Sequence, residues 1–321
     1  MSWRVLLTDR AWPDSSVEQR ELATVGAELI EAPDGSEPTL MKLAADVDAI
    51  MTCWAPVTEA VVRAAVKCRH IARMGIGLDN IAVSVATEQR IRVTNVPDYC
   101  VEEVADHALA LLLACARKVA FFHQRTKAGE YRLQAGGPLR RLRGAVLGIV
   151  GMGRIARAVA ERARAFGFEV IAWTRSGNDH GSGARMVELP ELLRLSDFVS
   201  LNVPLTPETR HVLNRESLVL LKPTAFVINT SRGGLIDHAA LWDALQAGQF
   251  AGAALDVFDP EPPDLSQPLF RDERVIITPH TAFVSAESLL ELRRRAARQV
   301  AATLAGNIPE NVVNPQVDEN R

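Results

Sequence analysis

Residues 147–167 read LGIVGMGRIARAVAERARAFG, and this stretch decides the fold. Gly151, Gly153 and Ala156 form a GxGxxA pattern that follows an apolar, strand-like run and opens a helical segment ending at Gly167. The first glycine permits the tight turn, the second leaves no side chain between the backbone and a pyrophosphate, and the alanine lets the helix pack closely on the strand. The helix N-terminus then offers its amides to the phosphates. The stretch therefore predicts a strand, turn and helix that bind a dinucleotide.

Short apolar runs alternate with helix-length amphipathic segments on both sides of this turn. Such alternation is typical of repeated βα units, in which helices join parallel strands. It occurs in two series, one ending near Val96 and one beginning at Ala145. The sequence therefore predicts an α/β protein with two doubly wound parallel sheets. The expected strands are residues 3–9, 27–32, 48–53, 70–75 and 91–96 in the first series, and 145–150, 169–173, 198–203, 225–230, 252–257 and 275–280 in the second.

The composition is that of an ordinary globular protein. The length of 321 residues suits two domains, and 48% hydrophobic with 23% charged residues is a usual balance. The net charge of -3 favours neither nucleic acid nor a membrane as partner, so the arginine-rich run at 291–299 is expected to be a solvated helix face. No secretion signal or membrane-spanning run is visible, which predicts a cytoplasmic protein. The four cysteines lack metal-site spacing, so no metal is expected.

A long apolar segment separates the two series. It reads VEEVADHALALLLACARKVAFFHQR over residues 101–125, and its middle is apolar on nearly all sides. A helix of this kind is buried rather than solvated. We therefore expect one helix from Val101, packed between layers of the fold or against another subunit.

The end of the strand at 169–173 bears on the choice of cofactor. NAD-binding folds usually carry Asp or Glu about 20 residues past the glycines, where the carboxylate binds the ribose hydroxyls. This chain has Thr174, Arg175 and Ser176 there. Arg175 can pair with a 2′-phosphate that a carboxylate would repel, although an exposed Arg can also be indifferent surface. The sequence therefore favours NADP over NAD.

Three residues with complementary chemistry follow predicted strands, at the sheet edge where parallel sheets bind ligands. They are Arg232 in NTSRGGLID, Glu261 in ALDVFDPEPP and His280 in ITPH. Each alone is compatible with a surface or structural role. Together they supply a guanidinium for a carboxylate and ketone, an imidazole acid, and a carboxylate that keeps this acid protonated. The set predicts reduction of a 2-oxo acid.

A second glycine pair occurs in RMGIGLDNI, where Asn80 replaces the third small residue and no helix face follows. We therefore reject it as a nucleotide site. Consecutive amides around Gly75, Ile76 and Gly77 can instead point at one anion. The segment is either a carboxylate-binding loop or a plain connection.

These motifs together resemble the D-isomer-specific 2-hydroxyacid dehydrogenases over nearly the whole chain. The resemblance implies a Rossmann coenzyme domain, residues 101–288, inserted in a flavodoxin-like substrate domain, residues 1–100 and 289–321. The final helix would then cross back to the N-terminal half. The segments that carry the resemblance are RMGIGLDNI, NVPDYCVEEVADHALALLL, LGIVGMGRIA, INTSRGGLIDHAALWDAL, ALDVFDPEPP and ITPHTA.

The resemblance also implies roles for single residues. The family's catalytic Arg, Glu and His fall on Arg232, Glu261 and His280, and its substrate-carboxylate loop falls on Met74, Gly75, Ile76 and Gly77. Its nicotinamide-side Asp, which can hydrogen-bond the carboxamide, falls on Asp256. The remaining cofactor positions are Arg154 and Ile155 beside the pyrophosphate, and Pro204 and Thr230 along the cofactor.

The implied activity is hydride transfer between NAD(P)H and a small 2-oxo or D-2-hydroxy acid, in a homodimer. We expect reduction of glyoxylate or hydroxypyruvate with NADPH. One alternative is NAD-dependent oxidation of 3-phosphoglycerate or another 2-hydroxy acid, although no regulatory domain follows the last helix as in long phosphoglycerate dehydrogenases. Another is a non-catalytic dinucleotide sensor similar to transcriptional corepressors. Formate oxidation is disfavoured, because formate dehydrogenases carry Gln where this chain has Glu261.

Overall fold

The chain folds into two compact units, each described here by itself. The computed structural model describes residues 2–318. Unit 1 combines the chain up to Tyr99 with the chain from Ser285 onward, and unit 2 runs from Cys100 to Val284. The return to unit 1 comes at Ser285 rather than at residue 289, because Ser285 is the N-cap of the helix that belongs to unit 1. Both sheets are parallel throughout, so the predicted α/β fold class is confirmed.

Unit 1 is built on a five-stranded sheet with the order β2-β1-β3-β4-β5, the doubly wound order of flavodoxin-like folds. Leu6, Ile50 and Ile71 on its central strands are fully buried, as expected for strands covered on both faces. The strands are β1 (Trp3–Leu7), β2 (Ala27–Glu31), β3 (Ala49–Thr52), β4 (His70–Arg73) and β5 (Arg92–Thr94).

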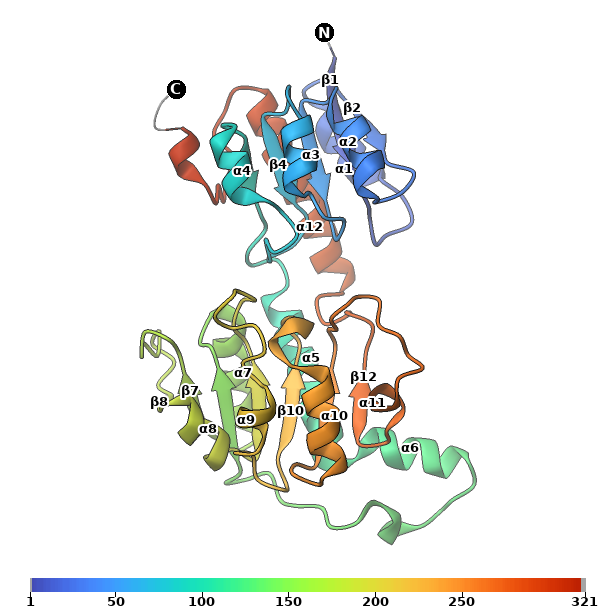
Figure 1. The fold of residues 1–321 in the computed structure, drawn as a ribbon, viewed down its shortest axis with the longest axis vertical. Coiled ribbons are helices and arrows are strands. Elements are labelled where there is room, and N and C mark those ends of the chain that lie inside the picture. Colours follow the sequence, from blue (N-terminus) through green and yellow to red (C-terminus); the bar gives the residue numbers. More distant parts are fainter. Residues whose placement is uncertain (1, 319–321) are drawn as a thin grey trace. The chain divides into compact units, whose positions relative to one another are not determined.

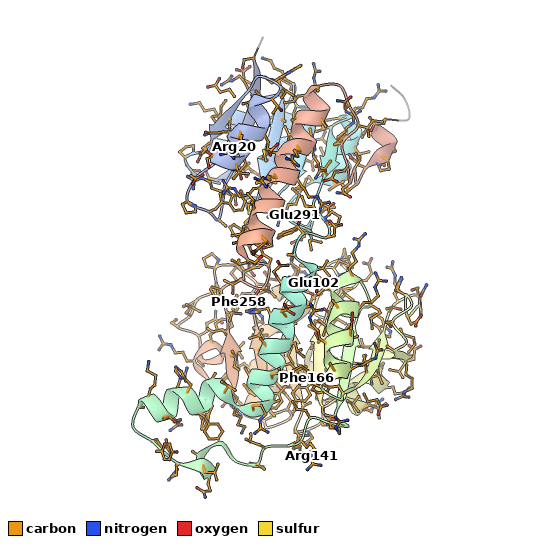
Figure 2. The ribbon with its side chains drawn as sticks, turned by 180° about the vertical axis from the view of Figure 1, so that it is seen from behind. Arg20, Glu102, Arg141, Phe166, Phe258 and Glu291 are labelled. Atoms are coloured by element: carbon orange, nitrogen blue, oxygen red, sulfur yellow. The ribbon has the colours of Figure 1, made fainter. Side chains whose placement is uncertain are left out.

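Helices cover both faces of this sheet. In Figure 1, α2, α3 and α4 lie in front of the strands, and Figure 2 shows α1 and α12 on the opposite face. The helix α4 was not expected, because its segment carries a weak amphipathic pattern over few residues. The helices are α1 (Ser16–Ala23), α2 (Glu37–Ala44), α3 (Glu59–Ala64), α4 (Val83–Glu88) and α12 (Ala286–Leu304), followed by the short η3 (Pro315–Val317).

The arginine-rich run of α12 is paired within unit 1. Arg293 donates to Glu18 of α1, whose side chain is fully buried, and Arg298 pairs with Glu21 one turn further on. Arg295 contacts Asp98 and Glu291 at 2.8 Å each. The pairs of Arg293 and Arg298 hold α12 against α1.

Unit 2 is built on a seven-stranded sheet with the order β12-β11-β10-β9-β6-β7-β8. Strand order reverses between β6 and β9, which is the switch point where doubly wound sheets bind ligands. The two-residue β8 was not expected, since so short a strand has no pattern of its own. The strands are β6 (Val146–Val150), β7 (Glu169–Trp173), β8 (Arg185–Met186), β9 (Phe198–Leu201), β10 (Phe226–Asn229), β11 (Gly252–Leu255) and β12 (Val275–Ile277).

Two hydrophobic cores fill the faces of this sheet. Leu147 and Ile149 of β6 pack with α5 and α7, whereas Val150 packs with α8, α9 and α10 on the other face. Figure 1 shows the second group of helices in front, and Figure 2 shows α5 and α7 from behind. The helices are α5 (Val101–Arg117), α6 (Val119–Lys127), α7 (Arg154–Ala165), α8 (Leu189–Leu195), α9 (Arg215–Leu218), α10 (His238–Gln246) and α11 (Pro268–Arg271), with the short η1 (Leu133–Gly136) and η2 (Gly233–Leu235).

The single helix expected from Val101 to residue 125 is two helices. Lys118 adopts a left-handed conformation with φ of 52°, and its amide closes the last turn of α5 on the carbonyls of Ala114 and Cys115. The helix α5 packs against α7, where Arg162 binds Glu102 and Asp106 at once. In α6, by contrast, no residue is buried. The apolar pattern continued across Lys118, so it gave no sign of the break.

No helix among residues 2–318 is long and apolar enough to cross a membrane.

Candidate functional site

The turn after β6 has the geometry that its glycines predict. Gly151 has φ of +94°, and a Cβ there would lie 2.7 Å from the backbone oxygen of Asn202 at the end of β9. A side chain at Gly153 would instead meet nothing within 4 Å. Gly153 is the N-cap of α7, so the first amides of that helix face the same space. The first glycine is required by the fold, and the second keeps the mouth of the turn open for a phosphate group.

Two buried polar atoms beside this turn lack a protein partner. They are Oγ1 of Thr230, which follows β10, and Oδ1 of Asn202, which follows β9. Neither atom has a hydrogen-bond partner among residues 2–318. Buried polar groups are nearly always satisfied, so these atoms suit a polar ligand at the carboxyl edge of the sheet. Asn202 was not among the predicted residues, although it follows a strand in the same way as Thr230. The Gly151 turn and these two unpartnered atoms together fit a dinucleotide cofactor.

The residues expected at the ribose lie where β7 ends. Thr174 is partly buried and its Oγ1 donates to the carbonyl of Asn178, which closes the turn after β7. Arg175 is exposed, and its charge helps to lower the pKa of the exposed Glu208, after the hydrogen bonds from Thr206 and from the Glu208 amide. Arg154 is exposed at the first turn of α7, and Ile155 is partly buried. Pro204 lies in the exposed loop after β9, where its carbonyl accepts from Thr209.

His280 and Glu261 form a hydrogen-bonded pair in unit 2. His280 Nδ1 lies 2.7 Å from Glu261 Oε2, and the backbone amide of Phe258 donates to Glu261 Oε1 at 2.8 Å. Burial alone would raise the pKa of the Glu261 carboxyl. The hydrogen bond and charge of His280, the Phe258 amide and the charge of Arg232 outweigh it and lower the pKa. The carboxylate is therefore ionised at neutral pH, and its partner imidazole presents Nε2 as the remaining site for a proton.

Arg232 is brought close to this pair by the turn after β10. The next residue, Gly233, packs directly on the chain after β11, since a Cβ there would lie 1.9 Å from the carbonyl carbon of Phe258. Asn229 holds the turn by donating to the Arg232 carbonyl at 2.8 Å. The Arg232 guanidinium donates to the Ser231 carbonyl, and its charge acts on Glu261. The three residues predicted from separate strand ends therefore lie together.

Asp256 lies under the turn that carries His280. Its side chain is fully buried and accepts hydrogen bonds from Thr278 Oγ1 at 2.6 Å and from the amides of Thr281 and Ala282 at 2.9 Å. The resemblance implies a contact of Asp256 with the nicotinamide carboxamide, which would be made in addition to these hydrogen bonds. A carboxylate has about four acceptor positions, so a further contact with a ligand is compatible with this arrangement.

The predicted substrate loop lies in unit 1, directly after β4. Within the described part of the chain, the amides of Gly75, Ile76 and Gly77 donate to no carbonyl. Asn95 instead fixes the loop by donating to the Ile76 carbonyl at 2.7 Å. Such unpaired consecutive amides suit a carboxylate.

The end of β4 adds a positive charge beneath this loop. The buried Arg73 packs so closely under the loop that a Cβ on Gly75 would lie 2.5 Å from its Nη1. Arg73 also donates to the carbonyl of Met74, which is itself buried. Sequence reasoning missed Arg73, because an Arg that ends a strand usually points into solvent.

Among residues 2–318 no cluster of His, Cys, Asp or Glu is arranged to hold a metal ion. A phosphate-binding turn at the switch point, with a carboxylate-held imidazole and a guanidinium in the same unit, defines a Rossmann-type oxidoreductase.

Comparison with known proteins identifies the family. Residues 109–282 match the D-isomer specific 2-hydroxyacid dehydrogenase, NAD binding domain family. The chain is 41% identical to a glyoxylate reductase of Korarchaeum cryptofilum, over 89% of this chain and 88% of that protein. It is 40% identical to a hydroxypyruvate reductase of Thermotoga maritima, over 78% of this chain and 82% of that protein.

A solved structure agrees with these relatives. The NADPH-dependent glyoxylate/hydroxypyruvate reductase of Sinorhizobium meliloti, in complex with NADP and malonate, has a TM-score of 0.88 and 29% identity, over 98% of this chain and 97% of that one. The chain belongs to the D-isomer-specific 2-hydroxyacid dehydrogenase family. It is an NAD(P)-dependent oxidoreductase, as the sequence predicted.

Proposed function

We propose that this enzyme reduces glyoxylate and hydroxypyruvate to the corresponding 2-hydroxy acids, with NADPH as the preferred cofactor. The observation that carries the proposal is the His280–Glu261 pair at 2.7 Å with the charge of Arg232 beside it. The names of the relatives in Korarchaeum cryptofilum and Thermotoga maritima support the two substrates.

Each charged group has a distinct task in this proposal. Arg232 binds the substrate carboxylate and polarises the ketone. In unit 1, the amides of Gly75 to Gly77 are assigned to carboxylate binding. His280 donates the proton on Nε2 to the oxygen that becomes the hydroxyl. Glu261 keeps the imidazole protonated and oriented through Nδ1. The reduced nicotinamide, when bound, supplies the hydride.

The cofactor is assigned to the edge of the sheet in unit 2. The Gly151 turn and the amides at Gly153, Arg154 and Ile155 would hold the pyrophosphate. Thr230, Pro204 and Asp256 would line the nicotinamide half, and Asn202 joins them because of its orphaned Oδ1. Thr174 and Arg175 would lie at the ribose phosphate. NADP is favoured because the three residues directly after β7, Thr174 to Ser176, include no carboxylate, and the Sinorhizobium meliloti relative was solved with NADP.

Replacing Arg175 with alanine is expected to lower kcat/KM for NADPH about 10-fold and to leave the NADH value within about twofold, since one charge-assisted hydrogen bond to the 2′-phosphate is lost. Steady-state kinetics with both cofactors measure this. Arg194→Ala, at an exposed position on α8, is the matched control and should change neither value. A native enzyme that prefers NADH, together with an unchanged NADPH value in Arg175→Ala, would contradict the assignment.

Replacing Glu261 with glutamine is expected to move the basic limb of the reduction profile to lower pH, because an opposite charge within hydrogen-bond reach of His280 is removed. Since the pKa of Glu261 is lowered, its carboxylate is charged over the whole assay range. In this proposal the His280–Glu261 pair supplies the proton that reduction consumes, so the rate of reduction falls as pH rises. Without the carboxylate this fall comes at lower pH. The measurement is kcat/KM from about pH 5 to about pH 9.

The control for this profile is Glu216→Gln, an exposed position on α9. It should leave both limbs in place. A basic limb that coincides in the native enzyme and in Glu261→Gln would show that the pair does not set the protonation of the acid.

The substrate proposal is tested by a spectrophotometric screen of short 2-oxo acids with NADH and NADPH in parallel. Glyoxylate and hydroxypyruvate should give the highest kcat/KM. Pyruvate and 3-phosphohydroxypyruvate are the comparison substrates, and a clear preference for the phosphorylated acid would favour the alternative of phosphoglycerate oxidation.

We also propose that the protein is a cytoplasmic homodimer. Its domain organisation in this proposal is a coenzyme domain, unit 2, inserted in a substrate domain, unit 1. Support for the dimer comes from the segment after α5, where Val119, Tyr131 and Leu133 are 57%, 94% and 82% exposed and α6 buries no residue. Apolar surface of this kind is typical of an interface. A single-chain mass in light scattering would contradict the dimer. The four cysteines, none in a disulfide, suit a reducing compartment.

A further inference from the structure

The helix α5 contributes a histidine to the support of the His280 turn. His107 lies in the second turn of α5, and its side chain is 24% exposed. Its Nε2 is 3.0 Å from Thr278 Oγ1 and 3.6 Å from Asp256 Oδ1. None of the roles proposed above involves His107, and sequence reasoning assigned it none.

The direction of the hydrogen bonds follows from the number of protons available. Thr278 Oγ1 has a single proton, and Asp256 Oδ1 at 2.6 Å can only accept when ionised. The hydroxyl therefore donates to Asp256 and must accept from His107. Nε2 of His107 carries a proton in this arrangement. His107, Thr278 and Asp256 form a chain with one direction, from α5 to the end of β11.

The far end of this chain holds the backbone around His280. The Asp256 carboxylate accepts from the amides of Thr281 and Ala282, and the Asp256 carbonyl accepts from the His280 amide at 2.8 Å. His280 itself has φ of +53°, a left-handed conformation that residues with a Cβ adopt at a cost. Such a backbone persists only where its surroundings determine it. Helix α5 contacts this support through the hydrogen bond between His107 and Thr278, which lies two residues before His280.

We propose that His107 is a positioning residue for His280. By donating to Thr278 it fixes the hydroxyl on Asp256, and Asp256 fixes the left-handed turn that aims the imidazole of His280. The inference rests on the proposed role of His280 as the acid. It concerns the rate of the proton transfer, because the two polar neighbours of His107, Thr278 and Asp256, support the turn that carries His280.

The chain offers a matched pair of substitutions at this position. In His107→Gln the side-chain amide nitrogen takes the place of Nε2 and can donate to Thr278, whereas in His107→Asn the shorter amide reaches only as far as Nδ1. Both variants are polar and uncharged, and thermal unfolding measures the effect of the lower helix propensity of Asn. We expect His107→Asn to lower kcat about 3- to 10-fold, the effect of one lost hydrogen bond. His107→Gln should recover most of that loss, and KM for NADPH and for the oxo acid should stay within about twofold in both.

Two further variants separate positioning from a general effect on stability. Thr278→Val removes the hydroxyl, so it should lower kcat as His107→Asn does, and the double variant should lose no more than either alone. His123→Asn, at an exposed histidine on α6, is the control and should leave kcat unchanged. Thermal unfolding of every variant checks that the fold is intact.

The decisive comparison is with a variant that lacks the acid. If His107 acts through His280, adding His107→Asn to His280→Ala should cause no further loss of kcat. A multiplicative loss in the double variant would overturn the proposal, and so would equal kcat values for His107→Asn and the native enzyme. If His280→Ala alone leaves kcat unchanged, His280 is not the acid. Failure of the proposed function is therefore distinguishable from failure of the role proposed for His107.

Discussion

Replacing His280 with alanine is expected to lower kcat for glyoxylate by about 10²- to 10⁴-fold, the usual contribution of a positioned general acid. The imidazole is held at Nδ1 by Glu261 at 2.7 Å, and the ring packs edge-on against Phe283 with centroids 5.9 Å apart. Its orientation is therefore fixed before substrate arrives. In the variant a water molecule can supply the proton, but nothing orients it as the imidazole is oriented. The substitution should therefore lower kcat and leave cofactor binding unchanged.

The measurement is steady-state reduction at saturating NADPH, with the dissociation constant of NADPH from fluorescence as the independent check. That constant should change by less than about threefold, because His280 is not among the groups assigned to the cofactor. His123→Ala on α6 is the matched control. A loss of kcat below about fivefold would rule out His280 as the acid.

Replacing Arg232 with lysine is expected to lower kcat/KM for the oxo acid by about 10- to 100-fold, mostly through KM. A planar guanidinium can bind both oxygens of a carboxylate, whereas an ammonium group is a point charge on a flexible stem. The position keeps its charge in this variant, so the effect on Glu261 is retained in part. The loss therefore reports on the geometry of substrate binding.

The comparison variant for this prediction is Arg215→Lys, at an exposed position on α9. It should leave the kinetics unchanged. The affinity for NADPH should be the same in both variants and in the native enzyme. Unaltered KM and kcat for glyoxylate in Arg232→Lys would exclude Arg232 from carboxylate binding.

Most of the fold follows from local patterns in the sequence. The eleven expected strands all form, because buried parallel strands are short apolar runs bounded by turn residues. The Gly151 turn was equally legible, since a positive φ and a close backbone neighbour leave glycine as the only residue that fits. Local patterns do not predict the break between α5 and α6. There a single left-handed residue, Lys118, interrupts a helix although the apolar pattern continues.

The sequence predicted which charged residues lie together at the sheet edge, but not which residues they contact. Arg232, Glu261 and His280 each follow a strand of one parallel sheet, so topology alone brings them to one edge. The buried partners of Asp256 and the hydrogen bond from His107 to Thr278 depend on which side chains meet across α5, β11 and β12. No sequence spacing encodes such a meeting. Arg73 was missed because an Arg at the end of a strand usually points into solvent, and Asn202 because the sequence does not show that its Oδ1 lacks a partner.

The placement of α12 imposes an order on biosynthesis. The five strands of unit 1 are translated first, yet one face of their sheet is covered by α12, which emerges only after all of unit 2. Glu18 on α1, fully buried in the finished protein, meets its partner Arg293 at that late moment. While unit 2 is being translated, the nascent chain therefore carries an apolar sheet face without its covering helix. Over the same period, the Glu18 carboxylate lacks its partner Arg293. We therefore expect this sheet face to stay uncovered until residues 286–304 have left the ribosome.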